Sequence, residues 1–258
     1  MADLSSIATE LLNAYTTRRT LAPLSQTYDG LSLDDAYEIQ QIQIRRRLDS
    51  GTRVIGFKVG LTSTAMQEQF GVGEPDFGHL LSDMLFAADA AVPTERFLQP
   101  RAEPEIALVL SQALKGPDLS VTDVVSATAY ALPAIEIIDS RIIDWRIGLH
   151  DTIADNASSG GLVLGQTPTS LAGLDLSLIG CVFRRNGRIL HTGAGAAVLG
   201  SPLHSATWLA NTLTRRGVEL AAGSIILTGS LTAAVTVAPG DSITAALDHL
   251  GSVTAVFG

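Results

Sequence analysis

The sequence predicts an α+β protein with a helical N-terminal portion and a β-rich body. Apolar residues recur at helical spacing before Val54, and from Val54 onward they gather in short β-type runs separated by Gly, Pro and Asp. The chain has 258 residues, of which 46% are hydrophobic, so it can bury a sizeable core as one domain or as two. This order of elements is typical of helices packed beside a sheet.

Two amphipathic helices are expected in the N-terminal portion. The first begins near Leu4, where apolar residues follow one another at helical spacing. These residues are Leu4, Ile7, Ala8, Leu11, Ala14 and Tyr15. The second helix starts after Ser32, a candidate N-cap with Asp35 three residues later, and ends at Gly51. The arginines at 45–47 suit its last turn, because a helix C-terminus favours cations.

The body is expected to consist mainly of strands. The clearest β-type runs cover residues 54–59, 106–110, 134–138, 162–164 and 225–228. Two helices are expected to interrupt them, at residues 122–131 and 202–215. A turn-rich stretch at 87–93 suggests a boundary near residue 90, which would separate an N-terminal part, 1–90, from a β-rich domain, 91–258. One compact unit is equally consistent with the pattern.

The charge balance argues against polyanionic partners. Lys and Arg total 17 against 26 Asp and Glu, and the resulting net charge of -9 repels both nucleic acid and anionic membranes. An anionic small molecule remains a possible ligand, because one bound divalent cation and one lysine reverse the local field inside an acidic protein.

Cysteine usage and hydropathy indicate a cytoplasmic protein. Cys181 is the only cysteine, which excludes an internal disulfide and the cysteine-based zinc arrangements. The N-terminus is acidic and leads into no signal-peptide core, and no stretch approaches the ~20 apolar residues that span a bilayer. The apolar composition therefore points to a large core or to the interfaces of a homo-oligomer.

Two glutamates open an apolar run that is expected to form a strand. Glu103 and Glu105 lie two residues apart in PRAEPEIALVL, so on a strand they share one face. Carboxylates held so close repel each other unless one is protonated or a cation sits between them, and a hard divalent ion with oxygen ligands is the usual solution. A solvated strand face is the simpler alternative for an isolated pair of this kind.

A third acid strengthens the metal hypothesis. Glu136 interrupts a run, ALPAIEII, that is otherwise apolar enough to be buried. A buried carboxylate needs a partner, since burying an unpaired charge is costly. Arg141 is one candidate partner, and a metal ion shared with Glu103 and Glu105 is the other.

Two further segments each offer one ionisable group. Lys58 stands in a predicted strand that leads to a glycine turn, and Asp76 stands in EPDFG. Desolvation near a metal is expected to lower the pKa of Lys58 enough for acid–base work, and Asp76 is expected to orient water. A surface lysine and an Asx-type turn are the common alternatives.

Seven stretches distributed over nearly the whole chain resemble one known group of enzymes. They read GFKVGLTS from Gly56, EPDFGHL from Glu74, PRAEPEIA from Pro100, EIIDSRIIDW from Glu136, DTIADNASSG from Asp151, GAGAAVLG from Gly193 and APGD from Ala238. The chain resembles the fumarylacetoacetate hydrolase superfamily, and within it the branch of 2-hydroxypenta-2,4-dienoate (2-keto-4-pentenoate) hydratases and 4-oxalocrotonate decarboxylases.

The resemblance implies a fold, a metal and a reaction. The expected fold is a mixed β-roll fronted by N-terminal helices. Mg²⁺ or Mn²⁺ is expected to be held by Glu103, Glu105 and Glu136 and to chelate a small 2-oxo or 2-hydroxy dienoic acid. Water then adds at C4 to give a 4-hydroxy-2-oxo acid, a step of meta-cleavage aromatic or steroid catabolism.

The resemblance also implies roles for individual residues. Lys58 is expected to act as the acid–base group nearest the substrate oxygens, Asp76 to direct proton transfer or the added water, and Ser158 to contribute a hydrogen bond. The backbone N–H groups of residues 59–61 are expected to bind the substrate carboxylate. These residues are Val59, Gly60 and Leu61, and glycine permits the close main-chain approach that such binding needs.

Three alternatives remain at this point. The carbon–carbon bond hydrolases of the superfamily carry a His and a Glu after the glycine turn, and the stretch from Gly60 to Gly78 holds no histidine. The decarboxylases share the metal site but typically lack the acid of the PDFG motif, which is Asp76 here. A non-catalytic scaffold in a complex with a neighbouring pathway enzyme is the third alternative, although a scaffold has no need for this full set of side chains.

Overall fold

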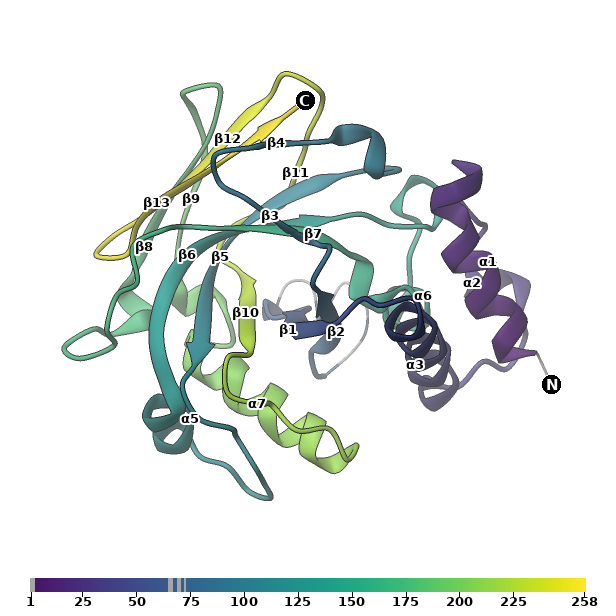
Figure 1. Cartoon of the computed structure of the whole chain (residues 1–258), viewed down its shortest axis with the longest axis horizontal. Coiled ribbons are helices and arrows are strands. Elements are labelled where there is room, and N and C mark those ends of the chain that lie inside the picture. Colours follow the sequence, from purple (N-terminus) through teal and green to yellow (C-terminus); the bar gives the residue numbers. More distant parts are fainter. Residues whose placement is uncertain (1–2, 65–66, 69–70, 72) are drawn as a thin grey trace.

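The computed structural model describes residues 3–64, 67–68, 71 and 73–258. Three helices precede the first strand: α1 (Leu4–Thr17), α2 (Leu24–Thr27) and α3 (Leu33–Asp49). The Asp3 carboxylate caps α1 by accepting from the Ser5 N–H, and Ser32 and Asp35 form the expected capping box at α3. These helices gather beside the N-terminus, at one side of the molecule (Figure 1).

A large mixed sheet forms the centre of the molecule. Its strands are β1 (Val54–Gly60), β2 (Asp76–Leu81), β3 (Leu85–Phe86), β5 (Arg101–Leu110), β6 (Thr128–Ile138), β7 (Ser159–Leu164), β10 (Ile225–Ser230) and β11 (Val235–Thr236). The order is β2-β1-β10-β5-β6-β7-β3, and β11 pairs with β5. The strand β2 therefore ends the sheet on one side, next to β1.

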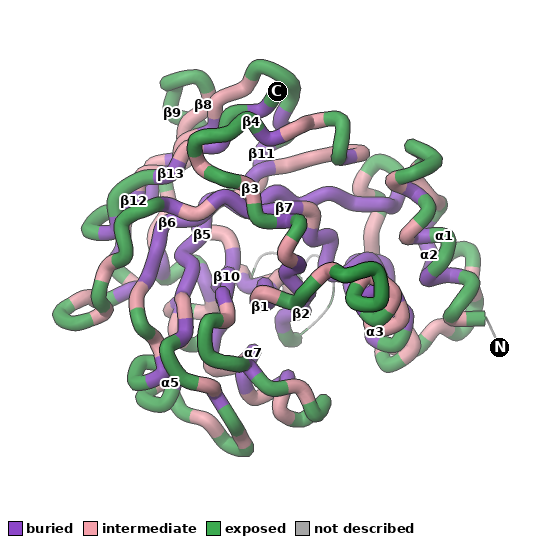
Figure 2. Tube along the Cα trace, viewed as in Figure 1, coloured by how far each residue is buried: buried purple, intermediate pink, exposed green. Residues whose placement is uncertain are grey.

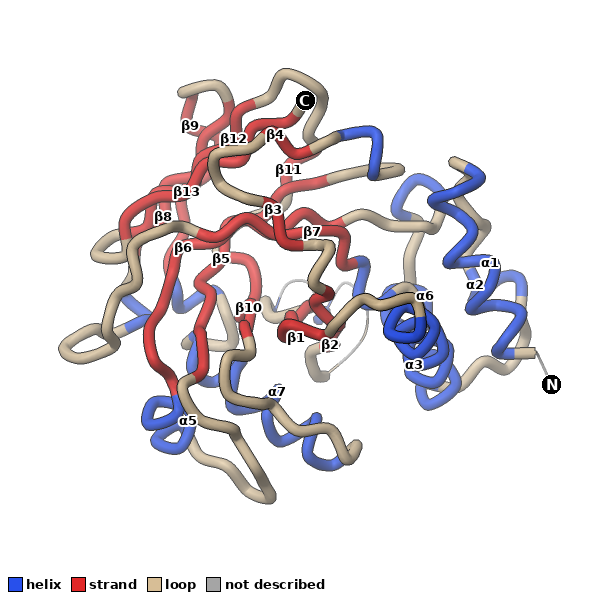
Figure 3. The backbone as a smooth tube through the Cα atoms, viewed as in Figure 1, coloured by secondary structure: helices blue, strands red, loops and turns tan. Residues whose placement is uncertain are grey.

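A second sheet packs against the first. It consists of β4 (Ala91–Val92), β8 (Gly180–Arg185), β9 (Arg188–Ala194), β12 (Ser242–Leu247) and β13 (Gly251–Phe257), in the order β4-β13-β12-β8-β9. The strand β12 contacts β5 and β6 of the first sheet, and β13 contacts β6 and β7. Figure 3 shows the strands filling the middle of the molecule, with most helices at its periphery.

Alternation along β5 and β6 separates the core from a second face. Ile106 and Leu108 of β5 and Ile135 of β6 point into the main core, which includes Ile243 of the second sheet. The intervening residues Ala107, Leu132 and Ala134 belong to a smaller cluster on the opposite face. The same alternation puts three glutamates on this second face: Glu103, Glu105 and Glu136. Figure 2 shows that the central strands are largely buried along their length.

Three longer helices and five short 3-10 helices complete the described chain. They are α5 (Val121–Ala127), α6 (Leu149–Ala154), α7 (Pro202–Arg215), η1 (Thr94–Arg96), η2 (Ile143–Trp145), η3 (Asn156–Ser158), η4 (Leu176–Leu178) and η5 (Gly195–Ala197). The helix expected at 202–215 is confirmed. The helix expected at 122–131 is wrong in its second half, because residues 128–131 begin β6 and pair with the end of β5.

The α+β class and the predicted strand positions are confirmed. Each predicted run lies within one observed strand of the large sheet: β1, β5, β6, β7 or β10. This sheet joins segments on both sides of residue 90, because β1 pairs with β2 and with β10. The division into 1–90 and 91–258 stays a prediction. Among the described residues, no helix combines the length and the apolar character needed to cross a membrane.

Candidate active site

Three carboxylates converge on the second face of the large sheet. Glu103 and Glu105 alternate along β5, and Glu136 of β6 is the direct cross-strand partner of Glu103. One oxygen from each of the three lies within 4.8 Å of the others. The sheet therefore brings together the three glutamates predicted from the sequence. Arg141, the alternative partner for Glu136, instead pairs with Asp155.

The electrostatics of this cluster suit a cation. Burial, followed by the charge of Glu136, raises the pKa of Glu103 to about 7. Burial and the charges of Glu136 and Glu103 raise the pKa of Glu105 well above its ordinary value. Neither carboxylate oxygen of Glu136 has a regular hydrogen bond to the described residues. Without a metal ion, Lys58 offsets only part of this negative charge, and protonation relieves the rest of the repulsion.

Lys58 lies beside the cluster, in the middle of β1. Its Nζ is 3.4 Å from Glu136 Oε1 and donates to the backbone carbonyl of Ala157 at 3.0 Å. The residue is only 4% exposed, which rules out the surface alternative. The expected lowering of its pKa is wrong for this arrangement. Burial lowers the pKa of Lys58, but the surrounding carboxylates, led by Glu136, outweigh burial and raise it.

Asp76 is the first residue of β2 and the cross-strand partner of Gly60. It is 1% exposed, so it belongs to a buried strand and not to a surface Asx-type turn. Burial raises the pKa of Asp76, and the nearby charge of Lys58 opposes that rise. Neither oxygen makes a hydrogen bond of full geometry to the described residues, although polar contacts from Thr152 and the Gly60 backbone favour the charged form.

Ser158 follows Ala157 in a segment of unusual backbone conformation. Asn156, Ala157 and Ser158 all have positive φ, between 50° and 53°. This left-handed region is uncommon for residues other than glycine, and three in succession require strong support from the surroundings. The Ser158 hydroxyl is buried and has no hydrogen-bond partner among the described residues. It is therefore available to a ligand.

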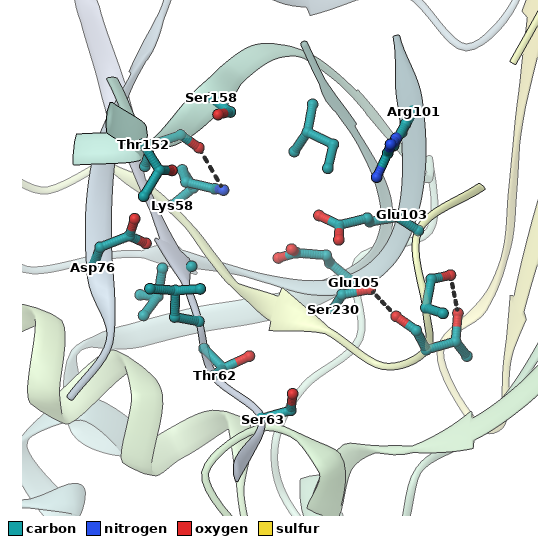
Figure 4. A pocket seen from close by; sticks show the side chains of 18 of the residues that line it. Lys58, Thr62, Ser63, Asp76, Arg101, Glu103, Glu105, Thr152, Ser158 and Ser230 are labelled. Atoms are coloured by element: carbon teal, nitrogen blue, oxygen red, sulfur yellow. Dashed lines mark hydrogen bonds between the residues drawn. The ribbon is translucent and has the colours of Figure 1, made fainter. Parts of the chain in front are cut away.

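These groups share one cavity of about 640 Å³. Lys58, Asp76 and Ser158 line it together with Glu103 and Glu105. Val59, Gly60 and Leu61 also line it, as expected for a substrate-binding backbone, and Leu61 has a positive φ of 55°. Figure 4 shows Lys58 and Asp76 on one side of the cavity and the two labelled glutamates on the other.

Several residues that line the cavity were not predicted as site residues from the sequence. Thr152 reaches the cavity from α6, and Arg101 lies two residues before Glu103 with its guanidinium 4.4 Å above the Trp145 ring. The end of β10 and the loop after it supply another wall, through Ser230, Leu231, Thr232, Ala233 and Ala234. The alternation of β5 could have placed Arg101 with the glutamates. No local pattern indicates the others, because they reach the cavity through the tertiary fold.

Comparison with known proteins agrees with the fold. Residues 55–257 match the family model described as Fumarylacetoacetate (FAA) hydrolase C-terminal. The chain is 46% identical to a 2-keto-4-pentenoate hydratase of Paraburkholderia xenovorans (strain LB400), over 97% of this chain and 93% of that protein. It is 45% identical to a 2-keto-4-pentenoate hydratase of Burkholderia vietnamiensis, over 98% of this chain and 97% of that one.

A solved structure is similar over the same extent. The 4-oxalocrotonate decarboxylase from Pseudomonas putida G7, complexed with magnesium and adipate, superposes with a TM-score of 0.95 at 38% identity. The match covers 99% of this chain and 97% of that one. The matched length, the identities and the shared fold lead to one conclusion: this chain belongs to the fumarylacetoacetate hydrolase family.

Proposed function

We propose that this protein is a metal-dependent hydratase that adds water to a 2-hydroxy-2,4-dienoate of the 2-oxopent-4-enoate type and yields a 4-hydroxy-2-oxo acid. The observation that carries the proposal is the convergence of three carboxylates within 4.8 Å of one another beside a cavity that Lys58 and Asp76 also line. The 46% identity to a 2-keto-4-pentenoate hydratase supports the same reaction.

Glu103, Glu105 and Glu136 would hold the cation, Mg²⁺ or Mn²⁺. The fit is supported by their mutual approach, by the raised pKa values of all three and by the absence of a regular hydrogen bond to either Glu136 oxygen from the described residues. Oxygen ligands of this kind suit hard divalent ions. When bound, the cation neutralises charge that develops on the 2-oxygen of the substrate and makes the conjugated chain electrophilic.

The protein's own groups would then move the protons. In the overall reaction the C2 hydroxyl loses its proton and C5 gains one, while water supplies hydroxide to C4 and a proton to C3. Lys58 would stabilise the negative charge that develops on the 2-oxygen as the C2 hydroxyl loses its proton, because the carboxylates around the lysine favour its charged form. Asp76 would take the proton of the attacking water, since a buried carboxylate with a raised pKa is a stronger base than an exposed one. Ser158 would donate a hydrogen bond to the substrate.

A 4-oxalocrotonate-type decarboxylase is the second candidate, supported by the TM-score of 0.95 to such an enzyme. Decarboxylation adds no water and so needs no base to activate one. The placement of Asp76 on the cavity wall therefore favours hydration. A non-catalytic scaffold is the third candidate, and it predicts no turnover at all.

Product analysis distinguishes the three candidates. Protein stripped of metal and then supplied with Mg²⁺ or Mn²⁺ is mixed with 2-hydroxypenta-2,4-dienoate or, separately, with 4-oxalocrotonate. We expect a metal-dependent loss of dienoate absorbance and a hydroxylated 2-oxo acid with an unchanged carbon count. Release of CO₂ as the main reaction would establish the decarboxylase, and absence of turnover with both compounds would favour the scaffold. Glu105→Gln should be inactive, whereas the exposed Glu38→Gln should match the unsubstituted protein.

A further inference from the structure

We propose that Asn156 is a positioning residue that holds the Ala157 carbonyl against Lys58 and thereby sets the place of the lysine ammonium in the cavity. The inference rests on the proposed function for its catalytic consequence. It concerns a residue that does not line the cavity, although the next two residues, Ala157 and Ser158, do, so Asn156 would act through its neighbours and not by touching the substrate.

The side chain of Asn156 forms a two-bond clamp on β2. Its Oδ1 accepts from the His79 N–H at 2.8 Å, and its Nδ2 donates to the His79 carbonyl at 2.9 Å. Because β2 is the terminal strand of the sheet, its outward backbone groups have no neighbouring strand to bond. The side-chain amide of Asn156 makes the two hydrogen bonds to His79 that the backbone of a neighbouring strand would otherwise make.

This clamp fixes a segment that would otherwise be unfavourable. Left-handed φ values at three successive non-glycine residues are unfavourable, so the segment needs compensating contacts. The preceding residue is anchored from the other side, because Arg141 donates to both the carboxylate and the backbone carbonyl of Asp155. Asn156 supplies the anchor on the β2 side.

The position of the clamp ties it directly to Lys58. Gly78 of β2 is the cross-strand partner of Lys58, and a Cβ added at Gly78 would lie 2.4 Å from the Asn156 carbonyl oxygen and 3.1 Å from the Ala157 Cβ. The left-handed segment therefore rests on the bare backbone opposite the lysine. From there the Ala157 carbonyl accepts from Lys58 Nζ at 3.0 Å.

The Ala157 carbonyl affects the position of the Lys58 ammonium because negatively charged carboxylates lie on the other side of that ammonium. Lys58 Nζ also contacts Glu136 at 3.4 Å, and Glu136 is one of the proposed metal ligands. The Ala157 carbonyl is a fixed, neutral acceptor for the ammonium and competes with the carboxylate. If the segment shifts, Lys58 turns toward the glutamates and away from its working position.

The test compares Asn156→Gly with a matched control, Asn186→Gly. Glycine tolerates the left-handed backbone at either site, so both substitutions remove only side-chain bonds. Asn186 also has a positive φ, 51°, and its amide also makes two hydrogen bonds, to Asp241 and to the Ser242 N–H, in the exposed β8–β9 turn. Asn156→Asp serves as a conservative variant, since it keeps the acceptor for the His79 N–H and loses the donor.

We expect Asn156→Gly to lower kcat on the dienoate by about 100-fold, because small misplacement of a catalytic group has effects of that order. KM and the rise in melting temperature caused by Mg²⁺ should change little. Asn156→Asp should recover about a tenth or more of the lost rate by restoring one of the two bonds. Asn186→Gly should leave kcat unchanged. A kcat for Asn156→Gly within twofold of Asn186→Gly would overturn the proposal, as would a loss of kcat only in proportion to unfolded protein.

A crystal structure of the Asn156 variant separates this inference from the proposed function. If the unsubstituted protein turns over no dienoate, the hydratase assignment fails, but the positioning role is still read from the Lys58–Ala157 contact. We expect that 3.0 Å contact to be lost or lengthened in Asn156→Gly, or in Asn156→Asp should the glycine variant not fold. The same contact at the same distance in the variant would contradict the role.

Discussion

At the scale of single residues, the site depends on carboxylates whose charges the protein itself does not fully neutralise. Lys58 provides one positive charge against Glu103, Glu105, Glu136 and Asp76, and all four acids have raised pKa values. Burial is the first cause of each shift. The cluster therefore works against the stability of the metal-free protein.

Glu103→Gln should make the metal-free protein more stable and abolish its stabilisation by metal. The substitution removes one member of a repelling group without changing the shape of the side chain, so we expect a gain of about 1 kcal/mol. Thermal unfolding in a chelator, and again with Mg²⁺ or Mn²⁺, measures both effects. Glu219→Gln, at an exposed position, is the control and should keep the metal-induced rise. Marked destabilisation of Glu103→Gln in the chelator would instead indicate a structural role.

His79 should make the folded state sensitive to acid. The residue is 3% exposed, and burial lowers its pKa to about 4. In the unfolded chain a histidine titrates near 6.5, so between these values only the unfolded state binds the proton and the free energy of unfolding falls as the pH falls. The loss should reach about 3 kcal/mol near pH 4.

Urea unfolding at pH 7 and pH 4.5 checks the contribution of His79. The free energy of unfolding should fall less between pH 7 and pH 4.5 in His79→Leu than in the unsubstituted protein. The difference between the two proteins removes the contributions of all groups that titrate alike in both. His249→Gln, which alters an exposed histidine, should behave like the unsubstituted protein. Equal losses in His79→Leu and the unsubstituted protein would rule the contribution out.

At the scale of elements, close approach of strands and segments places the side chains that line the cavity. The strand β1 carries Lys58 in its middle and Gly60 at its end, and antiparallel pairing with β2 sets Asp76 opposite that glycine. A Cβ added at Gly60 would lie 2.2 Å from Asp76 Oδ1. A glycine is needed at this position because any side chain there would occupy the space of the Asp76 carboxylate.

Gly60→Ala should displace Asp76 and lower kcat by about 100-fold while the protein remains folded. Steady-state kinetics and a thermal melt measure the two effects separately. Gly180→Ala is a matched control, because Gly180 also stands in a strand and has no atom within 4 Å of an added Cβ. Full activity in Gly60→Ala would show that the exact place of Asp76 does not matter to the rate.

Local patterns predicted most of the elements and the three glutamates. The Ser32–Asp35 capping box and the alternation of Glu103 and Glu105 are encoded within a few residues of sequence, and the structure contains both features. The end of α5 could not be found in this way, because the pairing of Tyr130 with Val109 overrides the local helical pattern. The pKa of Lys58 was predicted in the wrong direction, since its four acidic neighbours come from three separate strands.

At the scale of the whole molecule, the sheet joins distant parts of the chain. The strand β1 lies between β2 and β10, and β10 lies between β1 and β5. A core cluster runs from Ile7 of α1 to Phe257 of β13. Residues from both sides of position 90 therefore complete the same sheet and the same core.

Separate expression of residues 1–90 and 91–258 should yield fragments that do not fold alone. The first would lose β10 beside β1, and the second would expose the edge of β10 that β1 covers. Far-ultraviolet circular dichroism and urea unfolding of each fragment measure the outcome, with the full chain as the control. A cooperative transition in either fragment would support the division into two domains.

The wall formed by Ser230 to Ala234 has a consequence for the order in which the enzyme is made. During translation the glutamates leave the ribosome long before this wall exists, and the Gly229 N–H that donates to Glu105 at 2.8 Å is added almost as late. A nascent chain that ends before this wall carries the three glutamates but lacks one side of the cavity. The complete pocket arises only near the end of synthesis, so a prematurely terminated product has no means of turning over substrate.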